Sequence, residues 1–277
     1  MARGARLLTA VLVAVLLTAC AQSGAHDHAD DDRHGHDFQE APASPADPAD
    51  SRARPELGLM TSLPLYWPLG ADFAALASGA APRPWQRAAL EKRFELVPLD
   101  TLSAIPALAP DGQDENPLEG LEQLVVIQPR GLSPADNVAL DEWVRGGGHL
   151  LLVLDPALTG HYDLPLGDPG LPSHTALIPP VVERWGLEVR YDEAQPAEPR
   201  ELELSGAPLP VWLAGTLSRT REHEGACTLM ARAVIAQCEV AEGRVTLIAD
   251  AALFEHRALA GEAGEGIARL LRFAFAP

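Results

Sequence analysis

Lysine is almost absent from this sequence of 277 residues, because Lys92 is the only one. Arginine supplies nearly all of the positive charge, and the formal net charge is −18. Proteins that bind nucleic acid or anionic lipid headgroups do so through basic surfaces that displace counterions. The acidic balance therefore argues against nucleic acid as a partner.

Three motifs of common catalytic and nucleotide-binding sites are also missing. The chain has no G-x-S-x-G turn to present a serine nucleophile, no G-x-G-x-x-G and no G-x-x-x-x-G-K-[ST]. The glycines of "RGGGH" (145–149) follow a predicted helix and precede a predicted strand. Phosphate binding at a helix N-terminus needs the reverse order. We therefore expect these glycines to form a helix C-cap and a tight turn, and we expect no nucleotide cofactor.

Cysteine occurs only at positions 20, 227 and 238. Residues 1–20 place two arginines before an apolar stretch that suits an export signal and is short for a membrane span. The ending Leu17-Thr18-Ala19-Cys20 looks like a bacterial lipobox, in which Cys20 carries the lipid and begins the mature protein. An ordinary signal peptide or an uncleaved anchor is the alternative. By analogy with lipoprotein sorting in Gram-negative bacteria, Ala21 indicates the outer membrane, so we expect a lipid-anchored periplasmic protein.

In that oxidising compartment, a disulfide between Cys227 and Cys238 is the default expectation. The two cysteines flank "TLMARAVIAQ", whose two apolar stretches suit a short antiparallel pair with the cysteines nearly opposite. Two buried thiols are the alternative.

Residues 21–56 have the composition of a disordered linker rich in His, Asp, Pro and Ala. Imidazole and carboxylate groups at this density can bind transition metals weakly, which makes metal buffering one hypothesis. A soluble spacer is the alternative, and we favour it because no rigid scaffold fixes the ligands. The histidines concerned are His26, His28, His34 and His36.

A single α/β domain is expected over residues 57–277. Strands are predicted within 57–67, 94–100, 122–129, 149–154 and 245–249, and helices over 85–93, 133–145 and 264–275. The unbroken apolar runs are typical of parallel strands covered on both faces. Ser133, Pro134 and Asp136 form a capping-box pattern. Residues 227–250 read as an antiparallel meander with a turn at Glu242 and Gly243, whereas 158–217 offers only a helix candidate at 178–187.

Two segments, "LSPADNVALDEWVRGGGHLLLVLDP" and "EGRVTLIADAALFE", resemble the domain of ABC-transporter auxiliary and gliding-motility (Gld-type) components and related uncharacterised bacterial domains. The resemblance implies a flavodoxin-like, doubly wound sheet similar to class I glutamine amidotransferases. Catalytic relatives of that fold carry a cysteine after a central strand, with a histidine and a carboxylate later in the chain. Here the strand ending in "VLDP" is followed by Ala157 and Leu158, so no thiol is expected there.

Polar and aromatic residues that follow the predicted strands form a candidate crevice, because ligands of open α/β sheets bind beyond the carboxyl ends of the strands. Asp155 and Asp250 beside an aromatic pair suit a cation, a sugar or a peptide end. We favour the alternative that each aspartate caps a helix or fixes a turn. His161 and His256 read as isolated. The candidates are Tyr66, Trp67, Gln128, Asp155 and Asp250, with Asp100 at a further strand end.

The sequence thus favours a non-catalytic, lipid-anchored binding domain, accessory to a membrane transport or envelope assembly. A hydrolase with a metal bound by Asp155 and Asp250 is the second hypothesis, and metal buffering by the linker is the third.

Overall fold

The computed structural model describes residues 54–109, 111–165, 167–220 and 227–276. The predicted signal peptide, Cys20 and the linker histidines lie outside the described residues. In the described part, no helix combines the length and the apolar character that crossing a membrane requires.

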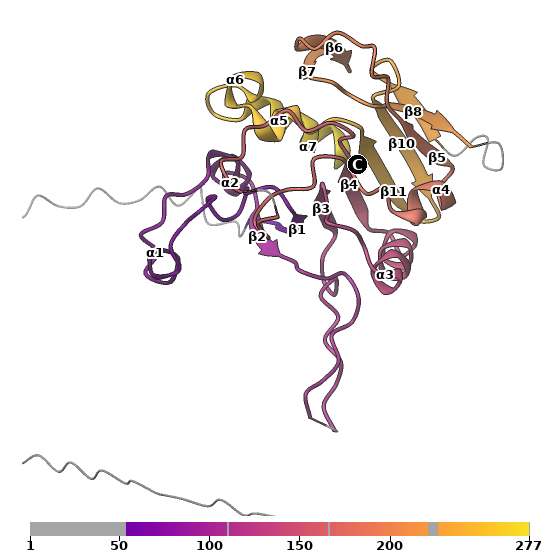
Figure 1. The fold of residues 1–277 in the computed structure, drawn as a ribbon. Helices are drawn as coiled ribbons and strands as arrows, with labels where there is room; N and C mark the ends of the chain where they lie inside the picture. Colours follow the sequence, from indigo (N-terminus) through magenta and orange to yellow (C-terminus); the bar gives the residue numbers. More distant parts are fainter. Residues whose placement is uncertain (1–53, 110, 166, 221–226, 277) are drawn as a thin grey trace, which may run out of the picture. The chain divides into compact units, whose positions relative to one another are not determined.

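A seven-stranded sheet organises the described part (Figure 1). Five adjacent strands are parallel, and two antiparallel strands extend one edge. The predicted mostly parallel sheet with a C-terminal meander is confirmed, and the strand order is consistent with the Rossmann- and flavodoxin-like class. In spatial order the strands are β2 (Glu95–Pro98), β1 (Glu56–Thr61), β3 (Gln123–Ile127), β4 (His149–Val153), β11 (Gly243–Ile248), β10 (Ile235–Val240) and β9 (Cys227–Met230).

Hydrophobic clusters lie on both faces of the sheet, which explains the unbroken apolar runs. In β3, Val125 and Ile127 join the cluster that includes residues of α2 and α7, whereas Leu124 and Val126 join the cluster beneath α3 and α4. Successive side chains of a strand point to opposite faces, so every position must be apolar. The helices are α1 (Phe73–Ala77), α2 (Trp85–Glu91), α3 (Pro134–Arg145), α4 (Pro180–Arg184), α5 (Ala252–Glu255), α6 (Arg257–Ala260) and α7 (Glu265–Ala274).

Helix α3 begins and ends as the sequence predicts. The Ser133 hydroxyl accepts a hydrogen bond from the Asp136 amide at 3.0 Å, and the Asp136 carboxylate accepts one from the Ser133 amide at 3.1 Å. This reciprocal pair is the capping box. Gly146 ends the helix, and a Cβ on Gly148 would lie 2.5 Å from the ring of Trp143. The glycines therefore serve the tight turn into β4.

The first strand is shorter than predicted, because β1 ends at Thr61 and not at Tyr66 or Trp67. The Thr61 hydroxyl accepts a hydrogen bond from the Leu63 amide at 3.0 Å, which bends the chain away from the sheet. Leu63 and Leu65 remain buried after the bend. The apolar pattern thus continues beyond the strand, and it misled the prediction of the strand's end.

Residues 158–217 contain more structure than the sequence indicates. β5 (Leu187–Arg190) pairs with β8 (Thr216–Arg219), and β6 (Arg200–Leu204) forms a hairpin with β7 (Ala207–Val211). Pro208 and Pro210 lie within β7, and proline is normally a signal against a strand. A two-stranded sheet tolerates it because proline's missing N–H can face away from the partner.

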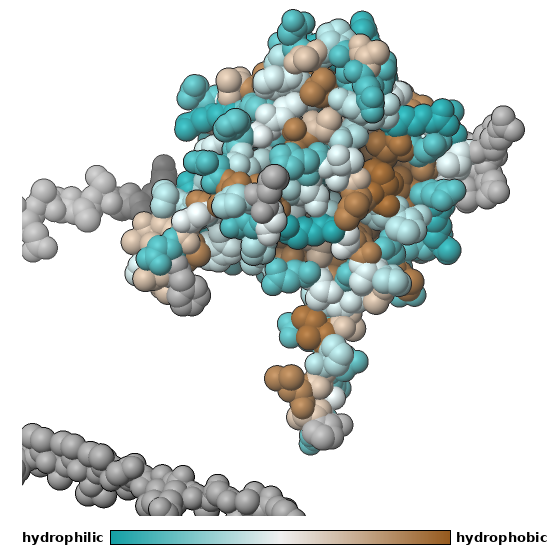
Figure 2. Space-filling view, in the orientation of Figure 1, coloured by the Kyte–Doolittle hydropathy of each residue, from teal (hydrophilic) through white to brown (hydrophobic). Residues whose placement is uncertain are grey.

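The described residues of the connection from β2 to β3, 99–109 and 111–122, contain no helix. Within its described residues, Ile105 pairs with Glu115 in an isolated antiparallel bridge, and the segment projects from the body as a long arm (Figure 1). Ile105 and Leu108 of this arm are exposed, and hydrophobic surface lies along it in Figure 2.

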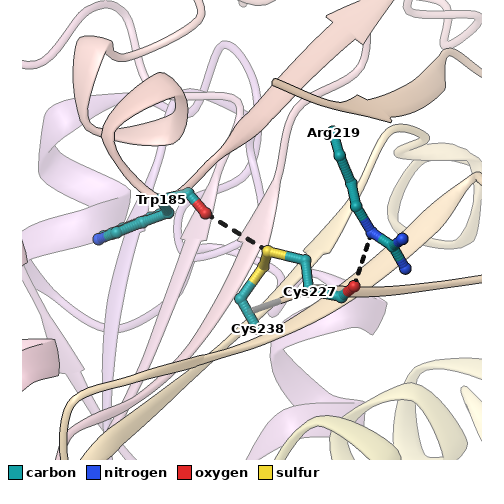
Figure 3. The surroundings of a disulfide bond; sticks show 4 residues. All are labelled: Trp185, Arg219, Cys227 and Cys238. Carbon is teal, nitrogen blue, oxygen red and sulfur yellow. Dashed lines mark hydrogen bonds between the residues drawn. A yellow bond between two sulfur atoms is a disulfide. The ribbon is translucent and has the colours of Figure 1, made fainter. Parts of the chain in front are cut away.

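The predicted disulfide between Cys227 and Cys238 is confirmed (Figure 3). The two residues are directly opposite each other in the antiparallel pair of β9 and β10. Arg219 of β8 donates a hydrogen bond to the carbonyl oxygen of Cys227 at 2.8 Å. The disulfide therefore fastens β9, the edge strand of the sheet, to its neighbour β10.

Candidate functional site

Gln128, directly after β3, joins two strand ends and a loop. Its side-chain oxygen accepts a hydrogen bond from the Asp155 amide at 2.8 Å, and its side-chain nitrogen donates to the carbonyl oxygens of Asp155 and Ser173 at 2.9 and 2.8 Å. Its backbone has a φ of 45°, in the left-handed region that few residues adopt. Gln128 is fully buried, so these contacts satisfy its amide where water cannot.

Asp155, after β4, and Asp250, after β11, make equivalent sets of contacts. In each, one carboxylate oxygen accepts from the amide two residues ahead, Ala157 at 2.7 Å or Ala252 at 2.9 Å. The other oxygen accepts from the amide of a separate segment, Ala251 for Asp155 and Trp212 for Asp250, both at 2.8 Å. Both aspartates fix turns, which is the alternative that the sequence analysis favoured.

The two aspartates share a low-dielectric environment with Glu255. Burial raises the pKa of Asp155 to about 7, and the negative charge of Glu255 adds to the rise. Burial, followed by the charge of Asp155, raises the pKa of Asp250 well above its usual range. Like charges that are close together and shielded from water disfavour ionisation of one another. The hydrogen bonds from the backbone act in the opposite direction.

Glu255, at the end of α5, is a site residue that the sequence analysis missed. Its carboxylate accepts hydrogen bonds from the amides of Thr159 and Gly160 at 3.0 and 2.9 Å, and from the Tyr162 hydroxyl at 2.6 Å. Burial, with the charge and hydrogen bond of Glu255, raises the pKa of Tyr162. No spacing signal links these residues, since more than ninety positions separate Glu255 from its partners.

His256 is not isolated, contrary to the expectation from the sequence. Its Nε2 atom lies 2.8 Å from the Thr159 hydroxyl, and its ring packs against Trp212 with centroids 4.7 Å apart. Burial lowers the pKa of His256, which favours the neutral imidazole. The structure therefore places a hydroxyl against an imidazole near the strand ends, where the sequence predicted no such pair.

Thr159 and His256 nevertheless differ from a typical nucleophile and base. The Thr159 hydroxyl also lies 3.2 Å from the Glu255 carboxylate, which holds the adjacent amides of residues 159 and 160. Acyl transfer requires donors aimed at a developing negative charge, and here the nearby amides already bind a carboxylate. Within the described part of the chain, no hydrogen bond orients the second ring nitrogen of His256.

Tyr66 and Trp67 lie apart from the buried aspartates. They line a pocket of about 330 Å³ beside the end of β1, together with Thr61 and Leu164. Gln128, Asp155 and Asp250 do not contribute to this lining. The five predicted residues therefore divide into a buried set that holds loops and an aromatic pair, in which Tyr66 is half-buried and Trp67 is exposed. Asp100 is exposed after the end of β2.

The described residues contain no cluster of three or more His, Cys, Asp or Glu side chains arranged to hold a metal ion. The four oxygens of Asp155 and Asp250 each accept a backbone amide. The linker histidines lie outside the described residues.

Comparison with known families gives a match over residues 54–204. The family described as an ABC-type uncharacterized transport system, the ABC-transporter auxiliary family, matches residues 54–204, more than half of the chain. The chain belongs to this family. The match begins just before β1 and ends with β6, so it includes the ends of β1, β3 and β4. Membership of this family gives the chain an ABC-type transport context. No curated protein matches this chain.

Three solved structures show distant similarity to this chain. An exo-β-1,4-mannosidase, Op5Man5 from Opitutaceae bacterium strain TAV5, is 12% identical over 80% of this chain and 36% of its own, with a TM-score of 0.45. A cold-adapted β-galactosidase from Rahnella sp. R3 is 9% identical over 80% of this chain and 32% of its own, with a TM-score of 0.44. The mmIFT52 N-terminal domain is 11% identical over 80% of this chain and 98% of its own, also with a TM-score of 0.44.

The chain spans only about a third of the length of the two glycosidases. With TM-scores below 0.5, these similarities assign neither a fold family nor an activity.

Proposed function

We propose that this chain is a non-catalytic, lipid-anchored periplasmic domain that acts by binding, as an accessory component of an ABC-type transport assembly. Family membership supports the transport context. The observation that supports a non-catalytic role is that the polar side chains at the strand ends are already occupied. Asp155, Asp250 and Gln128 all use their side chains to hold backbone groups.

The same observation disfavours a metal-dependent hydrolase built on the two aspartates. A metal ion would have to displace backbone amides that have no water to replace them, and each lost hydrogen bond of this kind costs about 1–3 kcal/mol. In a glutamine-amidotransferase-like sheet, which we propose as the finer fold, the nucleophile would follow a central strand. Ala157 and Leu158 follow β4 here and carry no nucleophilic atom.

Labelling and fractionation of the full chain test the anchor. We expect a palmitate analogue to label the wild-type protein and place it in the outer-membrane fraction of a Gram-negative host. The Cys20→Ser variant should take up no label. Label that persists in this variant, or a wild-type protein that carries none, would contradict the lipid anchor.

Chemical crosslinking in intact cells tests the transport role. We expect the wild-type chain to enrich an ABC-type permease or nucleotide-binding subunit over a control that expresses an unrelated outer-membrane lipoprotein. An equal amount of these subunits in both samples would overturn the assignment to a transport assembly.

The contact of Thr159 with His256 favours one competing function, hydrolysis through a threonine nucleophile. A fluorophosphonate probe distinguishes the two, because it reacts covalently with activated hydroxyl groups. We expect wild type and Thr159→Val to be labelled equally, at the level of the heat-unfolded protein. Labelling of native wild type that Thr159→Val abolishes would establish an enzyme.

A further inference from the structure

A basic pocket lies along α2 and the edge strand β2, which Figure 1 shows beside β1. Its volume is about 620 Å³, and four cationic side chains line it, against the carboxylates of Glu91 and Glu95. The cations are Arg54, Arg83, Arg87 and Lys92, the last being the only lysine of the chain. The pocket therefore has more positive than negative side chains, in a protein whose formal net charge is −18.

Glu91 holds the cations in place. Its two carboxylate oxygens accept from Arg87 at 2.7 Å and pair with Arg83 at 3.0 Å, and its backbone carbonyl accepts from Arg54. The Arg83 side chain is 63% exposed, so its guanidinium remains accessible while the ion pair orients it. Three arginines directed by one glutamate form a preorganised site for an anion, because the guanidinium group binds carboxylate and phosphate oxygens in pairs.

Arg87 connects this basic pocket to aromatic surface. Its guanidinium lies 4.0 Å from the ring centroid of Tyr66 and 5.6 Å from that of Trp67. The two rings meet edge to face at 4.9 Å, and Trp67 is 54% exposed. A large aromatic side chain that stays half exposed beside a pocket offers a stacking surface for a ligand.

Tyr66 lines both the basic pocket and the second pocket of about 330 Å³ at the end of β1. Most of the second pocket is apolar, and its one carboxylate is that of Asp168. β1 lies between β2 and β3, at the point where the strand order reverses. In doubly wound sheets ligands bind at this point beyond the carboxyl ends of the strands, which is where the second pocket lies. The basic pocket extends from Tyr66 along α2 to Glu95, at the start of β2.

We propose that the two pockets together bind one small anionic ligand, with a phosphate-like or carboxylate group among the arginines and a planar apolar body against Trp67. The orientation follows from charge, because Asp168 would repel the anionic group from the second pocket. The combined volume suits a ligand of small-molecule size. This site uses none of the buried aspartates and is independent of the proposed transport assembly.

Calorimetric titration of the full chain in a non-ionic detergent tests the proposal with 1-naphthyl phosphate as the probe. Inorganic phosphate and 1-naphthol each carry half of the proposed chemistry, so both should bind at least about tenfold more weakly. Arg83→Gln and Trp67→Ala should each weaken binding of 1-naphthyl phosphate about tenfold, which is the loss expected for one charge-assisted or stacking contact.

Arg184→Gln is the matched control, because Arg184 is 65% exposed and pairs with Asp141 as Arg83 pairs with Glu91. This variant should bind the probe like wild type, and urea unfolding verifies that all three variants fold. The proposal is overturned by the absence of saturable binding at millimolar 1-naphthyl phosphate. Equal weakening by Arg184→Gln, or equal affinity for inorganic phosphate, overturns it as well.

Discussion

The carboxyl ends of β4 and β11 differ sharply from the carboxyl end of β1, although the three strands are parallel and end on the same side of the sheet. After β4 and β11, Asp155 and Asp250 are 0% and 2% exposed and bind only backbone amides. After β1, Trp67 is 54% exposed and lines the pocket at the strand's end, and its neighbour Tyr66 lines both this pocket and the basic pocket. A polar residue at a strand end therefore indicates a ligand site only where loops leave it open.

The segments that follow the strands explain this difference. The chain after β4 packs back over the strand ends, because the Ser173 carbonyl accepts from Gln128 and the Ala176 amide donates to the Asp155 carbonyl, and α5 follows β11. Backbone groups covered in this way need acceptors, and the aspartates supply them. β1 lies next to the edge strand β2, and its chain bends away at Thr61.

Removing a strand-end carboxylate should produce the largest effect. Asp250→Ala leaves the amides of Trp212 and Ala252 without their acceptor, and we expect the free energy of unfolding to fall by about 3–5 kcal/mol. Asp192→Ala is the control, because exposed Asp192 makes the same local turn with the amide of Ala194. It should cost less than about 1 kcal/mol in urea unfolding. Similar losses in the two variants would show that burial is not what makes Asp250 important.

Glu255→Ala should have the next largest effect. It removes the acceptor for the amides of Thr159 and Gly160 and for the Tyr162 hydroxyl, in a half-buried position. We expect a loss of about 2–3 kcal/mol, and hydrogen exchange at residues 159–162 should become faster. Exchange that remains at the wild-type rate would mean that Glu255 does not hold this loop.

The raised pKa of Asp155 predicts how its contribution changes with pH. The pKa is about 7 in the folded protein and 3.8 ordinarily, so the neutral form stabilises the fold fully below pH 4, and this stabilisation is lost as the pH rises to 7. Asp155→Asn should therefore cost about 2 kcal/mol more at pH 5 than at pH 8 in urea unfolding.

Asp136→Asn is the control for this pH dependence. Although burial acts against it, hydrogen bonds from Ser133, Thr101 and the amides of Leu102 and Ser103 hold the pKa of Asp136 well below its usual range. Its stabilisation is lost only as the pH falls below the usual range, so its cost should be equal at pH 5 and pH 8. A cost of Asp155→Asn that does not change with pH would argue for a normal carboxylate.

Trp67→Ala should have the smallest effect on stability. Its ring is half exposed, and we expect a loss of less than about 1 kcal/mol. Trp185 is 3% exposed and donates a hydrogen bond to Asp141 at 2.8 Å, so Trp185→Ala should cost about 3–5 kcal/mol. Thermal unfolding compares the two, and a large loss for Trp67→Ala would give this residue a structural role.

The sequence predicts the features of this protein that depend on local pattern. The unbroken apolar runs give the parallel strands, Ser133 and Asp136 give the start of α3, and the spacing of the cysteines gives their pairing. Residues at strand ends, such as Asp155, can also be located. The sequence also favours their role in a local turn, but it does not show the second contact of Asp155, which is with the amide of Ala251, 96 positions away.

Features that depend on tertiary packing escape prediction. Asp136 has a second role as acceptor for Leu102 and Ser103, in a segment that shows no pattern of its own. Glu255 has no spacing relation to Tyr162, and the basic pocket unites Arg54 with residues of α2 through the fold alone. The two prolines of β7 hide this strand from prediction. Proline is excluded from the central strands of larger sheets, whereas a strand with one partner tolerates it.

The contacts at the strand ends form a continuous series across the sheet. The Ser62 hydroxyl donates to the carbonyl oxygen of Gln128, Gln128 bonds Asp155, and Asp155 bonds the amide beside Asp250. Opening any one of these segments exposes the buried partner of the next. We therefore expect the segments at the carboxyl ends of the strands to open as one cooperative unit. Amide protons at residues 128, 155 and 251 should accordingly show one shared free energy of opening in hydrogen exchange.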